Sequence, residues 1–195
     1  MFTGIVAAVG KIVSVSPLTA GKRLAIDTGN LGLDDVAVGD SIAVSGCCLT
    51  VVEKNGNQFI ADASKETLAC TTGLDAAGPV NLEKALRLAD RIGGHLVAGH
   101  VDGVGAILRF DAIGECYELE VRAPETLAKF VAAKGSITVN GVSLTVNAVA
   151  GSVFTVNLIP HTLAITTLKH LKAGAKVNLE VDLIARHVER LLAHD

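Results

Sequence analysis

The chain contains one sequence unit twice, and this repeat limits its fold more than any other feature. Residues 41–51 read SIAVSGCCLTV and residues 136–146 read SITVNGVSLTV, which is an offset of 136 − 41 = 95 residues. The offset holds from the start of each unit and becomes 97 where VNLE recurs at 80–83 and 177–180. One offset over most of both halves argues against chance similarity, so we expect two copies of one fold.

Each copy has the pattern of short β-strands joined by turns. Residues 41–52 and 136–149 are rich in Val, Ile and Thr with Gly interruptions, as in strands with bulges. Asn55-Gly56 is a two-residue hairpin signal. Regularly spaced short strands predict a small β-barrel or sandwich in each copy. With no Trp, one Tyr and five Phe, the cores must consist mainly of Val, Leu, Ile and Ala.

Two helices are expected outside these strands. The first spans residues 82–92 and ends at Gly93-Gly94. The second spans residues 123–134, with Pro124 near its start and Gly135 past its end. The glycine pair is the best domain boundary, because a helix stops there between the two copies.

A third helix is expected over residues 183–194. It carries Ile184, Val188, Leu191 and Leu192 on one face. The first spacings are heptad-like, which favours self-association of the helix. Docking of the same face on the chain's own barrel is an equal alternative. The predicted domains are therefore residues 1–92, residues 93–182 and a C-terminal oligomerisation segment, residues 183–195.

Composition and charge exclude several classes of partner. The formal net charge is −3 without a block of like charge, which argues against nucleic acid or an anionic membrane. No apolar run reaches the roughly 18–20 residues of a membrane helix. The N-terminus lacks the pattern of a signal peptide. The four cysteines are therefore expected as free thiols in a reducing cytoplasm.

Several common catalytic motifs are missing. The sequence has no Walker loop and no Gly-x-Ser-x-Gly elbow. Gly103-x-Gly105 lacks the third glycine of a dinucleotide fingerprint. The spacing of His95 and His100 does not suit a metal pair, and Cys47-Cys48 has the wrong spacing for zinc, so no metal site is predicted.

The two copies differ in chemistry at positions where their scaffolds match. At these positions the first copy offers a thiol, while the second offers a hydroxyl, imidazoles, an ammonium and a carboxylate. Such asymmetry is expected when like molecules bind both pockets and play different roles. The aligned pairs are Cys48 with Ser143, Ile5 with His100, Glu66 with His161, Gly39 with Lys134, and Ala85 with Asp182.

Each of these residues also has a structural explanation. A cysteine in a barrel strand is more often a small buried hydrophobe, which applies to Cys48. His100 can be a structural histidine. Asp182 directly precedes a helix and can cap it, and Lys134 ends a helix, where a cation is favourable. Hydroxyl groups such as that of Ser143 can bond along the sheet. Residue types alone do not decide between these roles and chemistry.

A set of short motifs extends along the whole chain: MFTGIV (1–6), SGCCLT (45–50), KETL (65–68), GGHL and GHV within 93–101, GVSLTV (141–146), IPHTL (159–163) and VNLEVD (177–182). Together these motifs resemble those of the riboflavin synthase family. Asn140 departs from the family pattern, which often has Asp there; this weakens a carboxylate role at that position and leaves the fold unaffected.

The resemblance implies an all-β fold of two tandem six-stranded Greek-key β-barrels, related by the internal repeat, plus a C-terminal α-helix. It implies a homotrimer assembled through that helix. The active site would lie between the N-terminal barrel of one subunit and the C-terminal barrel of a neighbour. An association with a lumazine synthase shell is left open.

The resemblance also implies a reaction, the last step of riboflavin biosynthesis. Two molecules of 6,7-dimethyl-8-ribityllumazine dismutate by transfer of a four-carbon unit, giving riboflavin and 5-amino-6-ribitylaminouracil, with no metal or external cofactor. The 7-methyl group of one molecule is acidic, and we expect His100 or a nearby hydroxyl to handle its proton. Cys48 or an activated water would add to carbon 7 of the other. Holding the two rings face to face can contribute about 7–11 kcal/mol.

Site residues are carried over from the family by position. The catalytic candidates are Phe2, Ser41, Cys48, His100, Ser143, Thr145 and Asp182. Ligand contacts assigned to the first barrel are Gly4, Ile5, Val6, Cys48, Leu49, Thr50, Asp62, Ala63, Ser64, Lys65, Glu66 and Thr67. Those assigned to the second are Gly99, His100, Val101, Lys134, Ser143, Leu144, Thr145, Leu158, Ile159, Pro160, His161, Thr162 and Leu163.

Two other functions are weighed against this enzyme. Lumazine proteins resemble the same family but hold a fluorescent lumazine or flavin ligand without turnover, and they tend to lose the reactive groups. Cys48, His100, Ser143 and Asp182 are all present here, which favours the enzyme. A structural, oligomerising β protein without a ligand is the other alternative, and the polar asymmetry between the copies argues against it.

Overall fold

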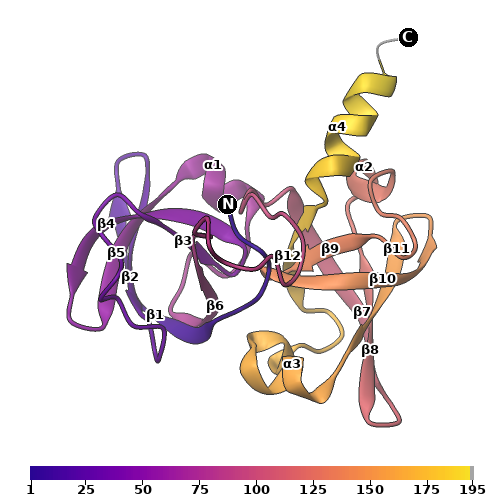
Figure 1. Cartoon of the computed structure of the whole chain (residues 1–195), viewed down its shortest axis with the longest axis horizontal. Helices are drawn as coiled ribbons and strands as arrows, with labels where there is room; N and C mark the ends of the chain where they lie inside the picture. The colour runs from indigo at the N-terminus through magenta and orange to yellow at the C-terminus, as the bar shows by residue number, and fades with distance from the viewer. Residues whose placement is uncertain (194–195) are drawn as a thin grey trace.

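A computed structural model of the chain describes residues 1–193 and contains two closed β-barrels side by side, with a helix projecting from the second (Figure 1). The first barrel consists of β1 (Ala8–Leu18), β2 (Gly21–Asp27), β3 (Ser41–Val44), β4 (Cys47–Asn55), β5 (Gln58–Ser64), α1 (Lys65–Cys70) and β6 (Gly78–Lys84). The second consists of β7 (Gly103–Ile113), β8 (Cys116–Arg122), α2 (Glu125–Ala128), β9 (Ser136–Val139), β10 (Val142–Ala150), β11 (Val153–Leu158), α3 (Pro160–Ile165), a 3₁₀ turn (Thr167–His170) and β12 (Lys176–Val181). Helix α4 (Leu183–Leu192) follows.

Both barrels have six antiparallel strands in the same order. The first closes as β1-β2-β5-β4-β3-β6, and the second follows the same path from β7 to β12. Within each, three consecutive strands form a meander and the last strand returns beside the first of them, which is a Greek key. The predicted fold class is confirmed, and closure leaves neither sheet with a free edge.

The repeat extends to local irregularities of the strands. The first strand of each barrel shifts register between Ile12 and Ser14 and between Ile107 and Arg109, which are equivalent positions. The β4–β5 and β10–β11 pairs also shift at equivalent positions. Such bulges bend a strand and increase its twist, which helps a short sheet to close. The predicted β4–β5 hairpin is present, with Gly56 and Asn57 as its turn residues.

Each barrel has its own aliphatic core, as the composition predicts. Val, Leu and Ile dominate both cores, and a single equivalent aromatic ring lies in each: Phe59 in the first and Phe154 in the second. Side chains on alternate strand positions point inward, so burial alternates along strands such as β5 and β11. The four cysteines are free thiols, as expected.

A symmetric hydrogen-bond network joins the barrels. Asn81 donates from Nδ2 to the Asn140 carbonyl (2.9 Å), and its repeat partner Asn178 donates to the Ser45 carbonyl (3.0 Å). Asn140 Oδ1 accepts from the Asn178 backbone N–H (2.8 Å). The backbone carbonyl of Asn140 therefore takes part in the barrel–barrel contact, and its side chain is an acceptor within the second barrel.

Two of the helix predictions are wrong. Residues 82–92 are not helical: Leu82–Lys84 belong to β6 and the following residues form turns. Val80 and Leu82 fill the barrel core, so the segment is needed as the closing strand. The helix predicted over 123–134 is reduced to α2, because turns replace it from Lys129 onward.

Helix α4 confirms the prediction for 183–192; position 194 of that prediction lies outside the described residues. The short helices α1 and α3 were not predicted. Each has six residues, too few to show a helical period in the sequence. Among residues 1–193, no helix is long and apolar enough to cross a membrane. The division of domains at Gly93-Gly94 stays a prediction.

Candidate functional site

The start of each repeat lies on the opposite barrel. The backbone of Phe2 pairs with that of its repeat partner Val97, with N–H to carbonyl distances of 2.7 and 3.0 Å. From this point the segments diverge. Segment 2–6 reaches the second barrel, where the Gly4 carbonyl accepts from Ser143 N–H (2.8 Å). Segment 97–101 reaches the first barrel, where the Gly99 carbonyl accepts from Cys48 N–H (2.8 Å).

This exchange corrects the grouping of the predicted site residues. The sequence alignment places Gly4–Val6 with Cys48 and Gly99–Val101 with Ser143. In the structure Val6 packs into the core of the second barrel, and Val101 packs against the core of the first. His100 therefore lies with the thiol of Cys48 and not with the hydroxyl of Ser143.

Two buried carboxylates hold the exchanged segments in place. Glu83 accepts from the N–H groups of Thr3 (2.7 Å) and Gly4 (3.0 Å). Its repeat partner Glu180 accepts from Ala98 (2.7 Å) and from Gly99 (3.0 Å). Burial raises the pKa of both carboxyls, while the backbone N–H groups act in the opposite direction.

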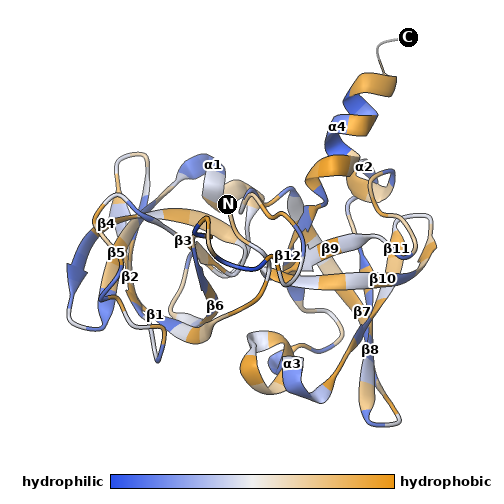
Figure 2. Cartoon of the chain, viewed as in Figure 1, coloured by the Kyte–Doolittle hydropathy of each residue, from blue (hydrophilic) through white to orange (hydrophobic). Residues whose placement is uncertain are grey.

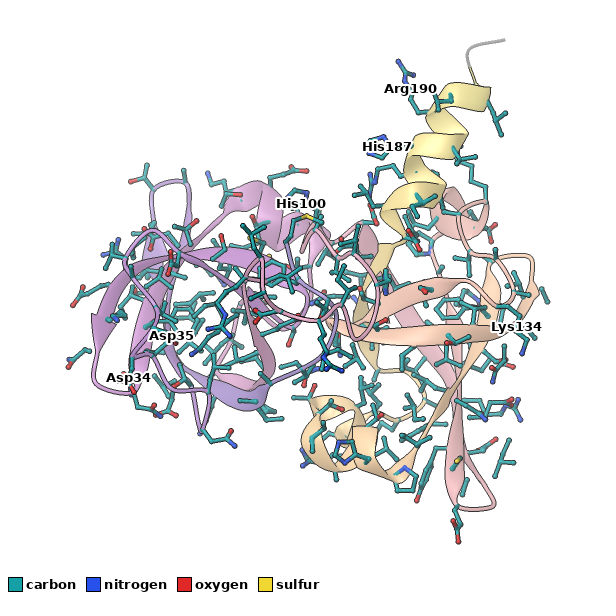
Figure 3. The ribbon with its side chains drawn as sticks, in the orientation of Figure 1. Asp34, Asp35, His100, Lys134, His187 and Arg190 are labelled. Carbon is teal, nitrogen blue, oxygen red and sulfur yellow. The ribbon has the colours of Figure 1, made fainter. Side chains whose placement is uncertain are left out.

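A pocket of about 240 Å³ lies between α1, the start of β4 and segment 99–101. Cys48 is half-buried and His100 is exposed at its edge, between the two barrels (Figure 3). A thiol and an imidazole in one pocket can supply a nucleophile and a proton acceptor. The lining residues are Cys47, Cys48, Glu66, Thr67, Cys70, Thr71, Gly99, His100 and Val101.

The two adjacent cysteines have different environments. Cys47 belongs to the core of the first barrel, and burial raises the pKa of its thiol to about 12. It therefore stays protonated at neutral pH and cannot act as a thiolate. Cys48 lies on the pocket side and packs beside the buried ring of Phe2. Of the two, Cys48 is the thiol available to a ligand.

Phe2 and Ser41 lie on the same side of the first barrel as Cys48. Phe2 is fully buried with Ala43 and Val97 and has no group that can transfer a proton. It forms the apolar floor beneath Cys48. Ser41 is half-buried at the start of β3, paired with Thr50, and its carbonyl accepts from Ala85 N–H (3.2 Å).

His95 lies beside Ser143 in the second barrel and was not among the predicted site residues. Its Nδ1 is 2.7 Å from Ser143 Oγ, and its Nε2 is buried without a hydrogen-bond partner among residues 1–193. Burial lowers the pKa of His95, and the charge of Asp182 acts in the opposite direction. A neutral imidazole next to a hydroxyl can accept or donate a proton. The sequence showed only its place in the GGHL motif.

The remaining catalytic candidates of the second barrel are more dispersed. Asp182 is half-buried and caps α4, with Oδ1 accepting from Ile184 N–H (2.9 Å), so its predicted alternative role is observed. Thr145 is exposed on β10 opposite Ser136. Lys134, predicted as a ligand contact, lies at the outer end of the second barrel, far from His100 (Figure 3).

Some predicted ligand contacts can use only their backbone. The side chains of Leu49, Ala63, Leu144 and Leu158 point into the barrel cores. Other predicted contacts have side chains at or near the surface: Ile5, Thr50, Asp62, Ser64, Lys65, Glu66, Thr67, Ile159, Pro160, His161, Thr162 and Leu163.

Two of these surface side chains already have partners. Asp62 forms a two-point ion pair with Arg23, with distances of 2.7 and 2.8 Å, and this pair lowers the Asp62 pKa. Ser64 caps α1, and its Oγ accepts from Thr67 N–H (3.0 Å). A ligand that contacts either side chain must share it with these interactions.

Comparison with known proteins agrees with the doubled architecture. The model of the lumazine binding domain family matches residues 3–85 and again 98–182. The chain is 45% identical to a riboflavin synthase of Photobacterium phosphoreum, over all of this chain and 90% of that protein. It is 46% identical to one from Brucella abortus, over 98% of each. This chain belongs to the riboflavin synthase family.

Solved structures show the same fold in a related protein, LumP. LumP complexed with 6,7-dimethyl-8-(1'-D-ribityl) lumazine superposes with a TM-score of 0.82 at 26% identity, covering 93% of this chain and 99% of LumP. LumP complexed with riboflavin gives a TM-score of 0.83 at 28% identity, with the same coverage. This fold thus holds lumazine and flavin rings in LumP.

Proposed function

We propose that this chain is a riboflavin synthase that converts two molecules of 6,7-dimethyl-8-ribityllumazine into riboflavin and 5-amino-6-ribitylaminouracil. One observation carries the proposal: the identity to riboflavin synthases extends over the whole chain. In addition, Cys48 and Ser143 lie at the equivalent starts of β4 and β10. Four carbons move between two identical molecules, so the substrates contain every atom of the products.

Within this function, Cys48 and His100 act together on one substrate. Cys48 or a water beside it adds to carbon 7 of the ring, and His100 takes up or returns the proton. Ser143 with His95 handles the 7-methyl proton of the other substrate, with Asp182 nearby. The proposed division of roles follows from the two contacts that the exchanged segments create, Gly99 with Cys48 and Gly4 with Ser143.

The test is to incubate the purified chain with 6,7-dimethyl-8-ribityllumazine and to separate the products by chromatography. Riboflavin and the aminouracil in equal amounts support the proposal. Tight fluorescent binding without product identifies a lumazine or flavin carrier instead. No binding at all rejects both functions and leaves a structural role.

We also propose that α4 assembles the chain into a homotrimer. Ile184, Val188, Leu191 and Leu192 are 47–75% exposed, and Figure 2 shows hydrophobic stretches alternating with hydrophilic ones along α4, which projects from the second barrel. Docking of this face on the chain's own barrel, the predicted alternative, is not observed. Sedimentation of the chain and of Leu191→Lys tests the proposal: a trimer that the substitution dissociates supports it, and a monomer rejects it.

The proposed enzyme works in the cytoplasm, where free thiols such as Cys48 persist. An association with a lumazine synthase shell would supply substrate directly to the pockets. Co-sedimentation of the two purified proteins tests this partner: separate migration of the two proteins argues against it.

A further inference from the structure

Segment 98–102 separates two cavities. On one side lies the pocket with Cys48, to which His100 contributes. On the other side lies a second cavity of about 320 Å³ between this segment, the end of β12 and helix α4. His100 and Val101 line both cavities, so a small displacement of the segment changes the shape of the pocket that contains Cys48.

Glu180 fixes this segment from within the second cavity. It is 4% exposed, and its two oxygens accept from Ala98 N–H (2.7 Å) and Gly99 N–H (3.0 and 3.2 Å). Two consecutive backbone groups on one carboxylate fix where Gly99, and His100 after it, lie opposite Cys48.

Helix α4 reaches Glu180 through an ion pair. Asp102, with a side chain 8% exposed, accepts from Val181 N–H (2.8 Å) and forms an ion pair with Arg186 on α4. Asp102 and Glu180 line the same cavity, and their negative charges repel each other. Arg186 supplies the positive charge that compensates Asp102.

We propose that Glu180 is a positioning residue for the first pocket, and that the Arg186–Asp102 pair makes its hold on segment 98–100 depend on how α4 is docked. The proposal deepens the proposed function, on which it rests, because it assigns a regulatory link between the proposed oligomerisation helix and the lumazine site. Protonation of Glu180 removes negative charge from the acceptor of the Ala98 and Gly99 N–H groups and loosens the segment that carries His100.

The first copy lacks this link. Glu83 holds Thr3 and Gly4 in the same way, but the position equivalent to Asp102 is Ala7, and no helix equivalent to α4 follows β6. Coupling through the Arg186–Asp102 pair therefore concerns the pocket of Cys48 and His100.

The surroundings of Glu180 give the direction of the pH dependence. Burial, with a smaller contribution from Asp102, raises the pKa of Glu180 to about 7 despite the backbone N–H groups. Since this folded-state pKa lies above the unfolded value, ionisation of Glu180 lowers stability as the pH rises through about 7. The same ionisation strengthens its hold on the segment. The titratable and charged groups facing it are Asp102, His100, Arg186, His187 and Cys47.

The experiment measures the affinity of the full chain for 6,7-dimethyl-8-ribityllumazine across neutral pH, by ligand fluorescence, in four variants. In the parent chain we expect affinity to fall as Glu180 takes up a proton. Asp102→Asn removes a repulsive charge and moves this fall to lower pH by about one unit. Arg186→Met moves it to higher pH. Glu180→Gln binds about tenfold more weakly at high pH and loses the fall.

Lys129→Met is the matched control. Lys129, the residue after α2, forms an ion pair with Glu189 of α4, so its loss removes a different contact of the helix and leaves the Arg186–Asp102 pair in place. Its pH profile should match that of the parent chain. A carbon-13 NMR titration of the Glu180 carboxyl gives the same midpoints independently of binding.

The outcomes separate this inference from the proposed function. A parent chain that binds no lumazine rejects the proposed function. A parent chain that binds normally, with the same profile in Asp102→Asn and Arg186→Met, rejects the coupling and leaves the proposed function intact. Equal shifts in Lys129→Met and Arg186→Met would also reject it, because the effect would then not depend on the Arg186–Asp102 pair.

Discussion

The two barrels share a scaffold and differ in the side chains that lie near Cys48 on β4 and Ser143 on β10. Cys48 and Ser143 occupy equivalent positions, and each donates its N–H to an equivalent glycine carbonyl from the other repeat. Beyond this contact the copies diverge: His100 stands at the edge of the Cys48 pocket, whereas His95 bonds to Ser143. The repeat thus provides two similar backbone arrangements whose side chains differ in type.

This difference also shows how a tandem repeat can form one site from two copies. Each barrel needs the opening segment of the other to complete the surroundings of its reactive residue. Gly46 of the first barrel and Gly141 of the second lie back to back where the barrels meet, and a Cβ on Gly141 would lie 2.6 Å from the Gly46 nitrogen. Neither barrel presents its complete pocket alone, so the comparison can be tested by changing one copy at a time.

The largest effects are expected from the glycines of the exchanged segments. Gly99 has φ +80°, and an added Cβ would lie 2.7 Å from Cys48 Cβ and 2.8 Å from the Phe2 ring. Gly99→Ala should lower the free energy of unfolding by about 2 kcal/mol or more, from backbone strain and overlap. Thermal unfolding measures the loss. Ligand protection of the Cys48 thiol against alkylation, read by mass spectrometry, measures the first pocket.

Gly4→Ala is the equivalent change on the other side, with a Cβ 2.6 Å from Ser143 Cβ. It should destabilise similarly and leave more protection at Cys48. Gly151→Ala, at φ +61° with open space around it, is the control and should cost only about 1 kcal/mol. Loss of Cys48 protection in Gly4→Ala but not in Gly99→Ala would contradict the exchange of segments.

Cys48→Ser makes the first copy like the second at the reactive position. We expect turnover to fall about tenfold to a hundredfold with little change in substrate affinity, because a hydroxyl is a poorer nucleophile than a thiolate of equal accessibility. Steady-state kinetics and ligand titration separate the two effects. Unchanged turnover would remove Cys48 from the mechanism. Cys70→Ser, a thiol at the edge of the same pocket, is the control.

His95→Gln tests the other copy. The loss of the bond to Ser143 Oγ should lower turnover about tenfold, while the ligand should still protect the Cys48 thiol from alkylation. Burial lowers the His95 pKa, so the parent chain should lose stability as the pH falls from the normal histidine value through the lowered one. Unfolding at several pH values should show this loss in the parent chain and not in the variant; equal pH dependence in both would contradict it.

The smallest effect is expected from Asp62→Asn, which gives the first copy the residue found at the equivalent position, Asn157. The Asp62–Arg23 pair is partly exposed, so its loss should change the free energy of unfolding by less than about 1 kcal/mol. Chemical denaturation measures this change. A fall in lumazine affinity larger than the fall in stability would show that the Asp62 side chain contacts the ligand.

Much of the fold could be predicted from the sequence, because β-strands and turns depend on local patterns. The repeat at an offset of 95, the Val- and Thr-rich strands and the β4–β5 hairpin all follow from neighbouring residues. The helix predicted over 82–92 was wrong because Val80 and Leu82 alternate into a core that only the closed barrel creates. Helices as short as α1 and α3 leave no such pattern.

The sequence by itself determined that the chain contains two like β units with unlike reactive residues, since both facts can be read by aligning it with itself. Only the tertiary structure decided which residues meet. Segments 2–6 and 97–101 cross because Phe2 and Val97 pair with each other and Glu83 and Glu180 hold the residues that follow. Alignment compares equivalent positions, whereas these contacts join positions that are not equivalent, and His95 meets Ser143 for the same reason.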